Sequence, residues 1–412
     1  MRHVLCAGLL SIAMGMAHAQ VIDDETFAPM GDLQILHTFA DLTSEGGVPE
    51  GGVTLDTRGQ QYGTTLFGGQ FGLGTIFRMN GAGQEVVLHS FNEATADGES
   101  PTSQMAMAPD GWLYGSTNVG GVHLGGVVYR ISTRGKFELV HSFVRSLEDG
   151  SEAWGPSGVI VSKSGQLWGV TQFGGYDGGQ GTVFKIGKRG QLETIHKFAI
   201  DGSEGWRPVA PLVQGVDGYM YGTTSAGAGD SPNGTIFRVN GNGKFEILHK
   251  FASTEGSGSM FPLVESADGV FIGVQSTGGT SGRGLIYRVD ASGAFQILHS
   301  FGKRNVDAST PFSGLALGAD GNFYGVTRDG GPNGGGTIYQ MTLGGQAAIV
   351  FGFQKPLFRD NKSMCAAPRA DRLAVGLDGG LYGQCTSGGI QTDVPNPRFM
   401  GATFKFYPAQ GR

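Results

Sequence analysis

The chain has 412 residues, of which 39% are hydrophobic and 16% are charged, and its formal net charge at pH 7 is −6. This hydrophobic share supports a large buried core, and the 75 glycines indicate a chain rich in turns. The negative charge makes nucleic acid a poor candidate partner, because such a partner requires a basic surface. No stretch of useful length has the hydrophobic period of a helix, so the pattern favours an all-β protein.

Residues 1–19 have the pattern of a secretory signal peptide. Arg2 precedes an apolar run from Val4 to Met16, and Ala17-His18-Ala19 forms a small-x-small cleavage site. We expect the mature chain to begin at Gln20. No cysteine follows the apolar run immediately, and no later run reaches the roughly 18 apolar residues that cross a bilayer. The sequence therefore predicts an exported chain without a membrane anchor, either periplasmic or secreted.

Residues 20–412 repeat one pattern seven times at intervals of about 50 residues, a period typical of propellers and solenoids. Each copy contains an aromatic or aliphatic residue before glycine, then a Gly-x-x-aromatic segment, then a histidine two residues before phenylalanine. The first element occurs at Tyr62, Tyr114, Trp168, Tyr221, Ile272, Tyr324 and Tyr382. The second begins at Gly74, Gly126, Gly181, Gly234, Gly284, Gly336 and Gly401. The third contains His37, His89, His141, His196, His249 and His299, with Phe351 in the seventh place.

Each copy holds four candidate strands, which is the composition of a propeller blade. In the second complete copy the predicted strands are Gln104–Ala108, Trp112–Thr117, Val127–Ser132 and Phe137–Phe143. Asp110-Gly111 separates the first two strands and supplies the positive φ that a tight hairpin needs.

The two ends of the repeat distinguish a closed ring from an open stack. The chain begins with a lone fourth strand, Leu33–Phe39, and ends with three strands of a copy, the last being Ala402–Phe406. Joining them into one blade removes exposed sheet edges, which otherwise pair with other chains. We therefore predict an all-β, seven-bladed propeller in a single domain over residues 20–412, with its last blade closed by the N-terminal strand.

Two cysteines remain after Cys6 leaves with the signal peptide. Cys385 is expected at the end of a second strand and Cys365 in the loop that leads into the same blade. An even pair in an exported chain favours a disulfide between Cys365 and Cys385, with two free buried thiols as the alternative. Two cysteines without a nearby histidine are too few ligands for a metal, so neither a metal nor a cofactor is predicted here.

The repeat resembles the GloVer tandem-repeat family, kelch-like propeller repeats of exported bacterial proteins. The motif residues are those of the series Tyr62 to Thr65, Gly68-Gly69, Gly74 to Phe77 and Leu88 to Phe91. The resemblance covers essentially the whole mature chain and implies the propeller fold. It implies no reaction, because no catalytic residues are tied to the repeat.

The repeated histidines and the basic residues that follow the third-strand aromatic receive a structural interpretation. His89 shares a strand face with Val87 and Phe91, so the histidines are expected to pack between neighbouring blades. The basic residues are expected to form ion pairs at blade edges. They are Arg78, Arg130, Lys185, Arg238 and Arg288.

Function is expected where the copies differ, in the loops between fourth and first strands and between second and third strands, which emerge on one face. Two residues before a proline, three consecutive copies place Trp154, Trp206 and Met260. An aromatic shelf beside charged groups is suited to a sugar, because a ring stacks on a pyranose and carboxylates accept its hydroxyls. The charged groups are Glu148, Asp149, Glu152, Glu204 and Arg207. The alternative is that the tryptophans only cover blade junctions.

Two function classes remain open. The first is an exported binding module whose loop face meets a polysaccharide or an extracytoplasmic protein, with Trp154, Trp206, Met260, Arg207 and Asp149 as ligand-binding residues. The second is a polysaccharide lyase or glycoside hydrolase, in which His123 acts as a base or Glu152 and Glu204 act as acid and base. The longest departure from the repeat, residues 354–372, could form a lid or basic rim on the same face or be an insertion held by the disulfide.

Overall fold

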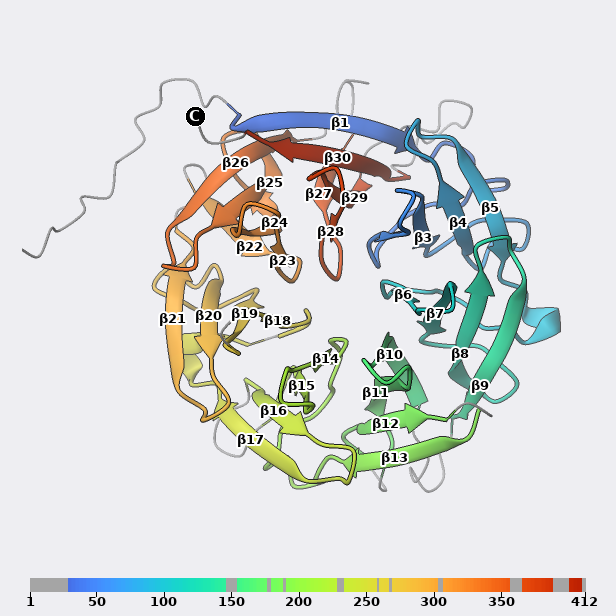
Figure 1. The fold of residues 1–412 in the computed structure, drawn as a ribbon, viewed down its shortest axis with the longest axis horizontal. Coiled ribbons are helices and arrows are strands. Elements are labelled where there is room, and N and C mark those ends of the chain that lie inside the picture. The colour runs from blue at the N-terminus through green and yellow to red at the C-terminus, as the bar shows by residue number, and fades with distance from the viewer. Residues whose placement is uncertain are drawn as a thin grey trace, which may run out of the picture.

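The computed structural model describes residues 29–145, 154–175, 179–187, 190–227, 233–257, 259–266, 269–302, 307–355, 365–387 and 400–409. The predicted signal peptide lies outside these residues. The described residues form seven antiparallel sheets arranged as blades around a central axis (Figure 1). The predicted all-β propeller with seven four-stranded blades is therefore confirmed.

Within each blade the first strand lies nearest the axis and the fourth lies outermost (Figure 1). The first blade contains β2 (Thr54–Leu55), β3 (Gln61–Thr65), β4 (Thr75–Met79) and β5 (Glu85–Ser90), and the second contains β6 (Ala106–Met107), β7 (Trp112–Thr117), β8 (Leu124–Ser132) and β9 (Phe137–Val144). The third contains β10 (Trp154–Val161), β11 (Leu167–Phe173), β12 (Thr182–Ile186) and β13 (Leu192–Lys197), and the fourth contains β14 (Val213–Gln214), β15 (Met220–Thr223), β16 (Thr235–Val239) and β17 (Phe245–Lys250). The fifth contains β18 (Val264–Glu265), β19 (Phe271–Gln275), β20 (Leu285–Val289) and β21 (Phe295–Ser300).

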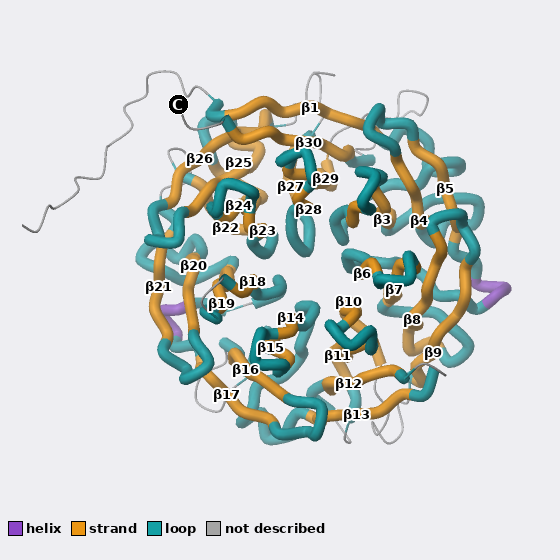
Figure 2. Tube along the Cα trace, in the orientation of Figure 1, coloured by secondary structure: helices purple, strands orange, loops and turns teal. Residues whose placement is uncertain are grey.

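In the last two blades the first strand is split into two short pieces. The sixth blade contains β22 (Ala308–Pro311), β23 (Ala316–Leu317), β24 (Phe323–Gly330), β25 (Gly334–Met341) and β26 (Ala347–Gln354). The seventh contains β27 (Ala366–Pro368), β28 (Ala374–Val375), β29 (Leu381–Ser387), β30 (Ala402–Pro408) and the N-terminal β1 (Gly31–Thr38). The short 3-10 helices η1 (Glu93–Thr95) and η2 (Ser253–Glu255) lie at the periphery (Figure 2).

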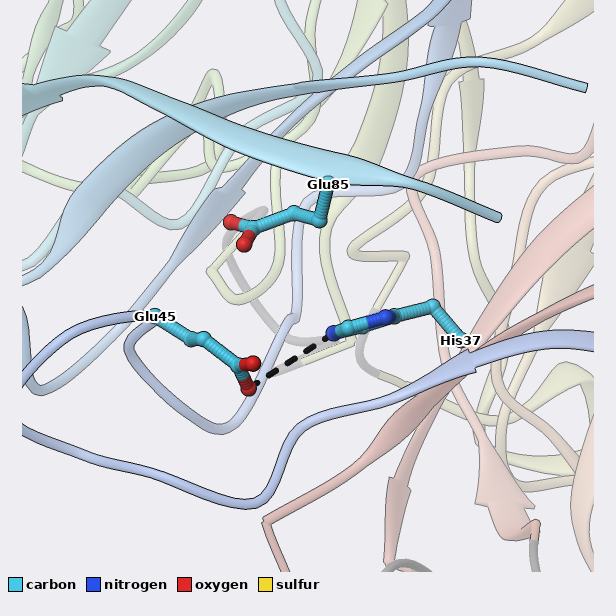
Figure 3. Close-up of side chains that lie close together, drawn as sticks. All are labelled: His37, Glu45 and Glu85. Atoms are coloured by element: carbon cyan, nitrogen blue, oxygen red, sulfur yellow. Dashed lines mark ion pairs between the residues drawn. The ribbon is translucent and has the colours of Figure 1, made fainter. Parts of the chain in front are cut away.

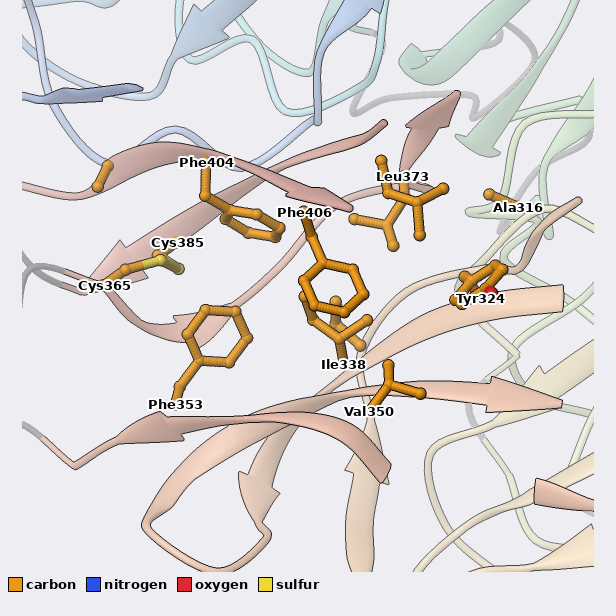
Figure 4. Close-up of a cluster of buried hydrophobic side chains, with 13 residues drawn as sticks. Ala316, Tyr324, Ile338, Val350, Phe353, Cys365, Leu373, Cys385, Phe404 and Phe406 are labelled. Carbon is orange, nitrogen blue, oxygen red and sulfur yellow. A yellow bond between two sulfur atoms is a disulfide. The ribbon is translucent and has the colours of Figure 1, made fainter. Parts of the chain in front are cut away.

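The N-terminal strand closes the ring as the sequence predicts. β1 pairs antiparallel with β30, from Gly31 opposite Pro408 to Thr38 opposite Ala402. In the same blade a disulfide joins Cys365 to Cys385 across a Cα–Cα distance of 5.4 Å. Figure 4 shows this disulfide beside the buried rings of Phe353, Phe404 and Phe406, in the hydrophobic core between the sixth and seventh blades.

The tyrosine and glycine of the repeat have separate structural roles. The hydroxyl of Tyr221 donates to Oδ2 of Asp217 at 2.7 Å and so ties the second strand to the Asp-Gly turn before it. The next residue, Gly222, lies under the third-strand ring of Phe237, where a Cβ would stand 2.5 Å from Cζ. Glycine is required there because a side chain and the aromatic ring cannot occupy the same space.

Three of the repeated histidines, His89, His196 and His249, stack on a phenylalanine of the next blade, as the sequence predicts. The ring of His89 in the first blade stacks on Phe137 of the second, with centroids 4.0 Å apart and an interplanar angle of 8°. Its Nε2 lies 2.8 Å from Oδ2 of Asp97, which comes eight residues later. At the outer edge of the blades, Lys185 forms an ion pair with Glu193 at 2.9 Å and Arg238 Nε donates to Glu246 Oε2 at 2.7 Å. Arg130 Nε likewise donates to Glu138 Oε2 at 2.7 Å, so the interpretation of the basic residues as ion-pair partners is confirmed for these three.

Candidate functional site

One face of the ring carries both classes of loop in which the copies differ. The segment that leads into a first strand, here called the pre-strand segment, pairs with the end of the second strand of the same blade. Trp154 stands opposite Phe173, and isolated bridges join Gly47 to Phe67 and Trp206 to Ala226. These loops form the loop face, which surrounds one mouth of the central channel.

The channel contains a cavity of about 530 Å³ lined by the first strands of all seven blades. The described lining is mostly aliphatic, and its charged residues are Asp371 and Arg372. Oδ2 of Asp371 accepts a hydrogen bond from the backbone N–H of Gln104 at 2.7 Å. Removal of water around its charge raises the pKa of the Asp371 carboxyl to about 7 and lowers the pKa of the Arg372 guanidinium. The cavity is thus an apolar space with one ionisable pair at its wall.

The Phe312 cluster is formed by Phe312, Arg328, Arg369 and Glu50, and it joins the sixth, seventh and first blades at this mouth. The guanidinium carbons of Arg328 and Arg369 lie 4.9 and 5.0 Å from the centroid of the Phe312 ring. A phenyl face attracts cations, so the ring holds two like charges near each other. Phe312 is itself fixed by an edge contact with the ring of Phe261, with centroids 5.6 Å apart.

Each arginine of the cluster also has a carboxylate partner. Arg369 Nη1 donates to Glu50 Oε1 at 2.8 Å, and Arg328 Nε lies 3.3 Å from Asp329 Oδ2. Burial raises the pKa of Glu50, and the charge of Arg369 opposes that shift. The side chains of Arg328 and Arg369 remain 48% and 37% exposed, so both can still reach a ligand. The cluster therefore offers guanidinium donors and carboxylate acceptors in a fixed arrangement.

Two residues of the predicted aromatic shelf, Trp154 and Trp206, lie in the pre-strand segments of the neighbouring third and fourth blades. The guanidinium of Arg207 in the fourth blade lies 5.4 Å from the centroid of the Phe173 ring in the third. Trp206 is half-buried, and its ring covers Gly202, where a Cβ would lie 3.0 Å from Cζ3. Trp154 begins β10 opposite Phe173, and its side chain lies outside the described residues. Arg207 and Phe173 therefore form a second arginine–phenyl pair beside Trp206, and this pair was not predicted from the sequence.

Met260 occupies a different position from the one its spacing suggests. In the fourth blade the first strand begins its pairing at Val213, five residues after Pro208. In the fifth blade the pairing begins at Val264, five residues after Ser259. Ser259 therefore takes the place of the proline, and Met260 stands where the sixth blade has Phe312 rather than where the fourth has Trp206. Its side chain is 39% exposed. Met260 consequently lies between the Phe312 cluster and the two tryptophans along the ring.

The predicted acid–base residues are not brought together as a pair among the described residues. Oε2 of Glu204 lies 2.9 Å from Nε2 of His196 and accepts from the backbone N–H of Ala199 at 3.0 Å. This is the arrangement of His89 and Asp97 in another blade, so Glu204 has a contact that the repeat accounts for. His123 is exposed in the turn between β7 and β8. Asp149 and Glu152 lie outside the described residues.

Phe312, Arg328 and Glu50 were not predicted as site residues from the sequence. One signal was present: the residue immediately after the pre-strand proline varies from blade to blade, with Glu50, Thr102, Val209, Phe312 and Arg369 among its occupants. Arg369 itself lies in residues 354–372, the segment predicted to be a lid or basic rim or an insertion held by the disulfide, and it contacts Glu50.

Comparisons with known proteins agree with the fold. Residues 26–155, 144–318 and 268–412 each match the model of a family described as Gloeobacter/Verrucomicrobia repeat. No curated protein matches the chain. Among the described residues, no helix has the length and apolar character needed to cross a membrane.

Several solved structures are similar at low sequence identity. The extracellular domain of a candidate hybrid two-component system of B. thetaiotaomicron has a TM-score of 0.57 and 13% identity, over 93% of this chain and 41% of that one. The extracellular domain of a candidate one-component system of the same organism has a TM-score of 0.56 and 13% identity, over 93% and 42%. A candidate 6-phosphogluconolactonase of Bacteroides uniformis has a TM-score of 0.50 and 17% identity, over 81% and 94%. The chain spans about two fifths of the two extracellular domains, and these likenesses establish the fold alone.

Proposed function

The chain belongs to the Gloeobacter/Verrucomicrobia repeat family, and we propose that it is an exported binding module whose loop face binds a glycan. The observation that carries the proposal is the Phe312 cluster at the channel mouth. Its two guanidinium groups, held over one phenyl ring, can donate hydrogen bonds, and the carboxylates of Glu50 and of the neighbouring Asp329 can accept them. Sugar hydroxyls require both kinds of partner at close spacing.

The rest of the loop face supports an extended ligand. The Phe173–Arg207 pair, the half-buried Trp206 and the exposed Met260 come from the third, fourth and fifth blades, and the Phe312 cluster comes from the next blades around the ring. Apolar and aromatic surface next to such charged groups suits consecutive sugar rings. The ligand would run along this arc, with the start of β10 at Trp154 near its far end.

Export is part of the proposal. The Cys365–Cys385 disulfide is a bond that persists in oxidising compartments and is uncommon in the cytosol. It agrees with the signal peptide predicted over residues 1–19. Periplasmic residence and secretion are both compatible with it.

Glycan binding is tested with immobilised neutral and acidic polysaccharides, followed by calorimetry on any polymer that is retained. Phe312→Ala and Arg369→Gln are expected to weaken binding about tenfold or more, since each removes about 1.4 kcal/mol or more of interaction. Arg58→Gln is the matched control, because Arg58 lies in the β2–β3 hairpin at the opposite end of the blade and is 73% exposed. This control should bind as the wild type does.

The same experiment separates the other function classes. Release of shorter sugars from any retained polymer would establish an enzyme that uses this face. Retention of no polymer, or retention that survives both Phe312→Ala and Arg369→Gln, would refute the proposed site. Retention of a protein from the same organism in the absence of any glycan would support the protein-partner alternative.

A further inference from the structure

The first histidine of the repeat, His37, differs from its equivalents in its contact with a carboxylate. In three other blades the histidine Nε2 lies 2.8 to 2.9 Å from a carboxylate oxygen, in the pairs His89–Asp97, His196–Glu204 and His249–Glu255. The equivalent distance from His37 Nε2 to Glu45 Oε2 is 3.6 Å, which is too long for a hydrogen bond. The His37–Glu45 pair is therefore wider than the equivalent histidine–carboxylate pairs of the three other blades.

The residue on the other side of the His37 ring also departs from the repeat. Where an equivalent histidine stacks on phenylalanine of the next blade, the centroids are 3.8 to 4.0 Å apart, as in His89–Phe137, His196–Phe245 and His249–Phe295. In the blade next to His37, the position of this phenylalanine is the first residue of β5, and Glu85 occupies it. A second carboxylate thus replaces an apolar ring beside the His37–Glu45 pair (Figure 3).

Two polar atoms at this position have no hydrogen-bond partner. They are Nε2 of His37 and Oε1 of Glu85, and both are buried from solvent. Burial and the nearby charge of Glu45 raise the pKa of Glu85 to about 8. A buried polar atom without a partner is unfavourable, so the site is incomplete without a group that satisfies the His37 nitrogen and the Glu85 oxygen.

We propose that His37, Glu45 and Glu85 bind a divalent metal ion of the zinc class. One ligand atom from each side chain lies within 4.8 Å of the other two. Zinc binds imidazole nitrogen and carboxylate oxygen at about 2.0 to 2.2 Å, so two ligands on a tetrahedral ion are about 3.4 Å apart. The 3.6 Å between His37 and Glu45 is close to that separation. Nitrogen with two carboxylates suits Zn²⁺ and its neighbours better than Mg²⁺ or Ca²⁺.

The site has a structural consequence because of where its ligands lie in the chain. His37 belongs to β1, the strand that closes the seventh blade, and Glu85 belongs to β5 of the first blade. Glu45 lies between them and also accepts from the backbone N–H of Ala40 at 3.1 Å. A bound ion would fix the closing strand β1, which pairs with β30 from the other end of the chain, to the first blade.

The test uses the full mature chain, stripped with EDTA and then titrated with Zn²⁺, Mn²⁺ or Ni²⁺. We expect about one equivalent of Zn²⁺ by elemental analysis and a rise of about 3 °C in Tm at 100 times Kd. His37→Gln and Glu85→Gln should each lower the affinity at least 100-fold and abolish this rise. His249→Gln is the control, because its ring faces Phe295 and it should leave zinc binding unchanged.

A second variant keeps the test independent of any folding defect. Glu85→Phe restores the residue type found opposite His89, His196 and His249, so it is expected to fold, to stack on His37 and to bind no zinc. Failure of the wild type to bind any of the three ions would overturn the proposal. Zinc binding that persists in Glu85→Phe and His37→Gln would also overturn it.

Discussion

The imidazole ring of His196 lies flat against the phenyl ring of Phe245, with centroids 3.8 Å apart and an interplanar angle of 2°. His196 belongs to the third blade and Phe245 to the fourth, so this stack is a contact between blades. The same imidazole meets Glu204 through Nε2 at 2.9 Å. One repeated histidine thus links a neighbouring blade to a loop of its own copy.

Removal of the phenyl ring should weaken the junction between these blades. Phe245 also contacts the rings of Phe198 and Phe237, with centroids 5.7 and 5.4 Å away. For a half-buried ring we expect Phe245→Ala to lower the free energy of unfolding by about 2 to 3 kcal/mol, measured by urea titration. Leu377→Ala, at a side chain that is 91% exposed, should change it by less than about 0.5 kcal/mol. Equal stability of the two variants would contradict the role assigned to the stack.

The contact of Glu204 predicts a structural defect rather than a functional one. Glu204→Gln replaces the carboxylate that contacts His196 and the Ala199 N–H with an uncharged amide, which weakens both hydrogen bonds. The free energy of unfolding should therefore fall by about 1 to 2 kcal/mol. Asp97→Asn, at the equivalent position beside His89, should have an effect of similar size. Glycan retention should be unchanged in both variants. Loss of retention or turnover in Glu204→Gln alone would restore the catalytic interpretation.

The buried histidines predict that the protein loses stability in mild acid. Burial lowers the pKa of His196 from its ordinary 6.5, and it does the same for His141 and His299. The unfolded chain therefore takes up these protons at a higher pH than the folded chain, and stability declines as pH falls below about 6.5. Each histidine can add at most about 1.4 kcal/mol per pH unit to the slope. Urea titrations between pH 5 and 8 should give a shallower slope for His196→Gln; an unchanged slope would contradict this assignment.

The ring could be predicted from sequence because each copy repeats residues with a local structural requirement. Gly222 must lie under Phe237, and Asp217 must accept from Tyr221, so those residue types mark the strands directly. The inner strand was less predictable. Residues 104–108 were expected to form a strand, yet β6 contains only Ala106 and Met107, because the backbone N–H of Gln104 donates to Asp371 of another blade instead of pairing with β7.

The candidate site was predicted less well, for two different reasons. Glu204 was singled out as a departure from the repeat, although an acid also stands eight residues after His89, at Asp97. That spacing was available in the sequence. The Phe312 cluster could not be predicted from the sequence, because Arg328 and Arg369 come from different blades and meet only after the ring has formed.

The disulfide should contribute to stability through the unfolded chain. Cys365 and Cys385 are 20 residues apart in sequence, and closing a loop of that size removes conformational entropy worth about 3 kcal/mol. We expect Cys365→Ala and reduction of the wild type to lower the free energy of unfolding by similar amounts. The reductant should have no effect on Cys365→Ala. A reductant-dependent shift in that variant would show that another part of the molecule responds to reduction.

Glu85 predicts a pH dependence opposite in sign to that of the histidines. In metal-free protein its pKa is raised from 4.5 to about 8 by burial and by Glu45, while His37 lies on its other side. The unfolded chain releases this proton above pH 4.5 but the folded chain keeps it until about pH 8, so this group's contribution to stability declines across that window. Glu85→Gln cannot ionise. In EDTA, the stability of Glu85→Gln relative to wild type should therefore rise from pH 5 to pH 8, as measured by urea titration at each pH.

Saturating Zn²⁺ should remove the decline in wild-type stability over this pH range, because the ion favours the ionised carboxylate of Glu85. A constant difference between variant and wild type in EDTA would mean that Glu85 ionises as freely in the folded protein as in the unfolded chain.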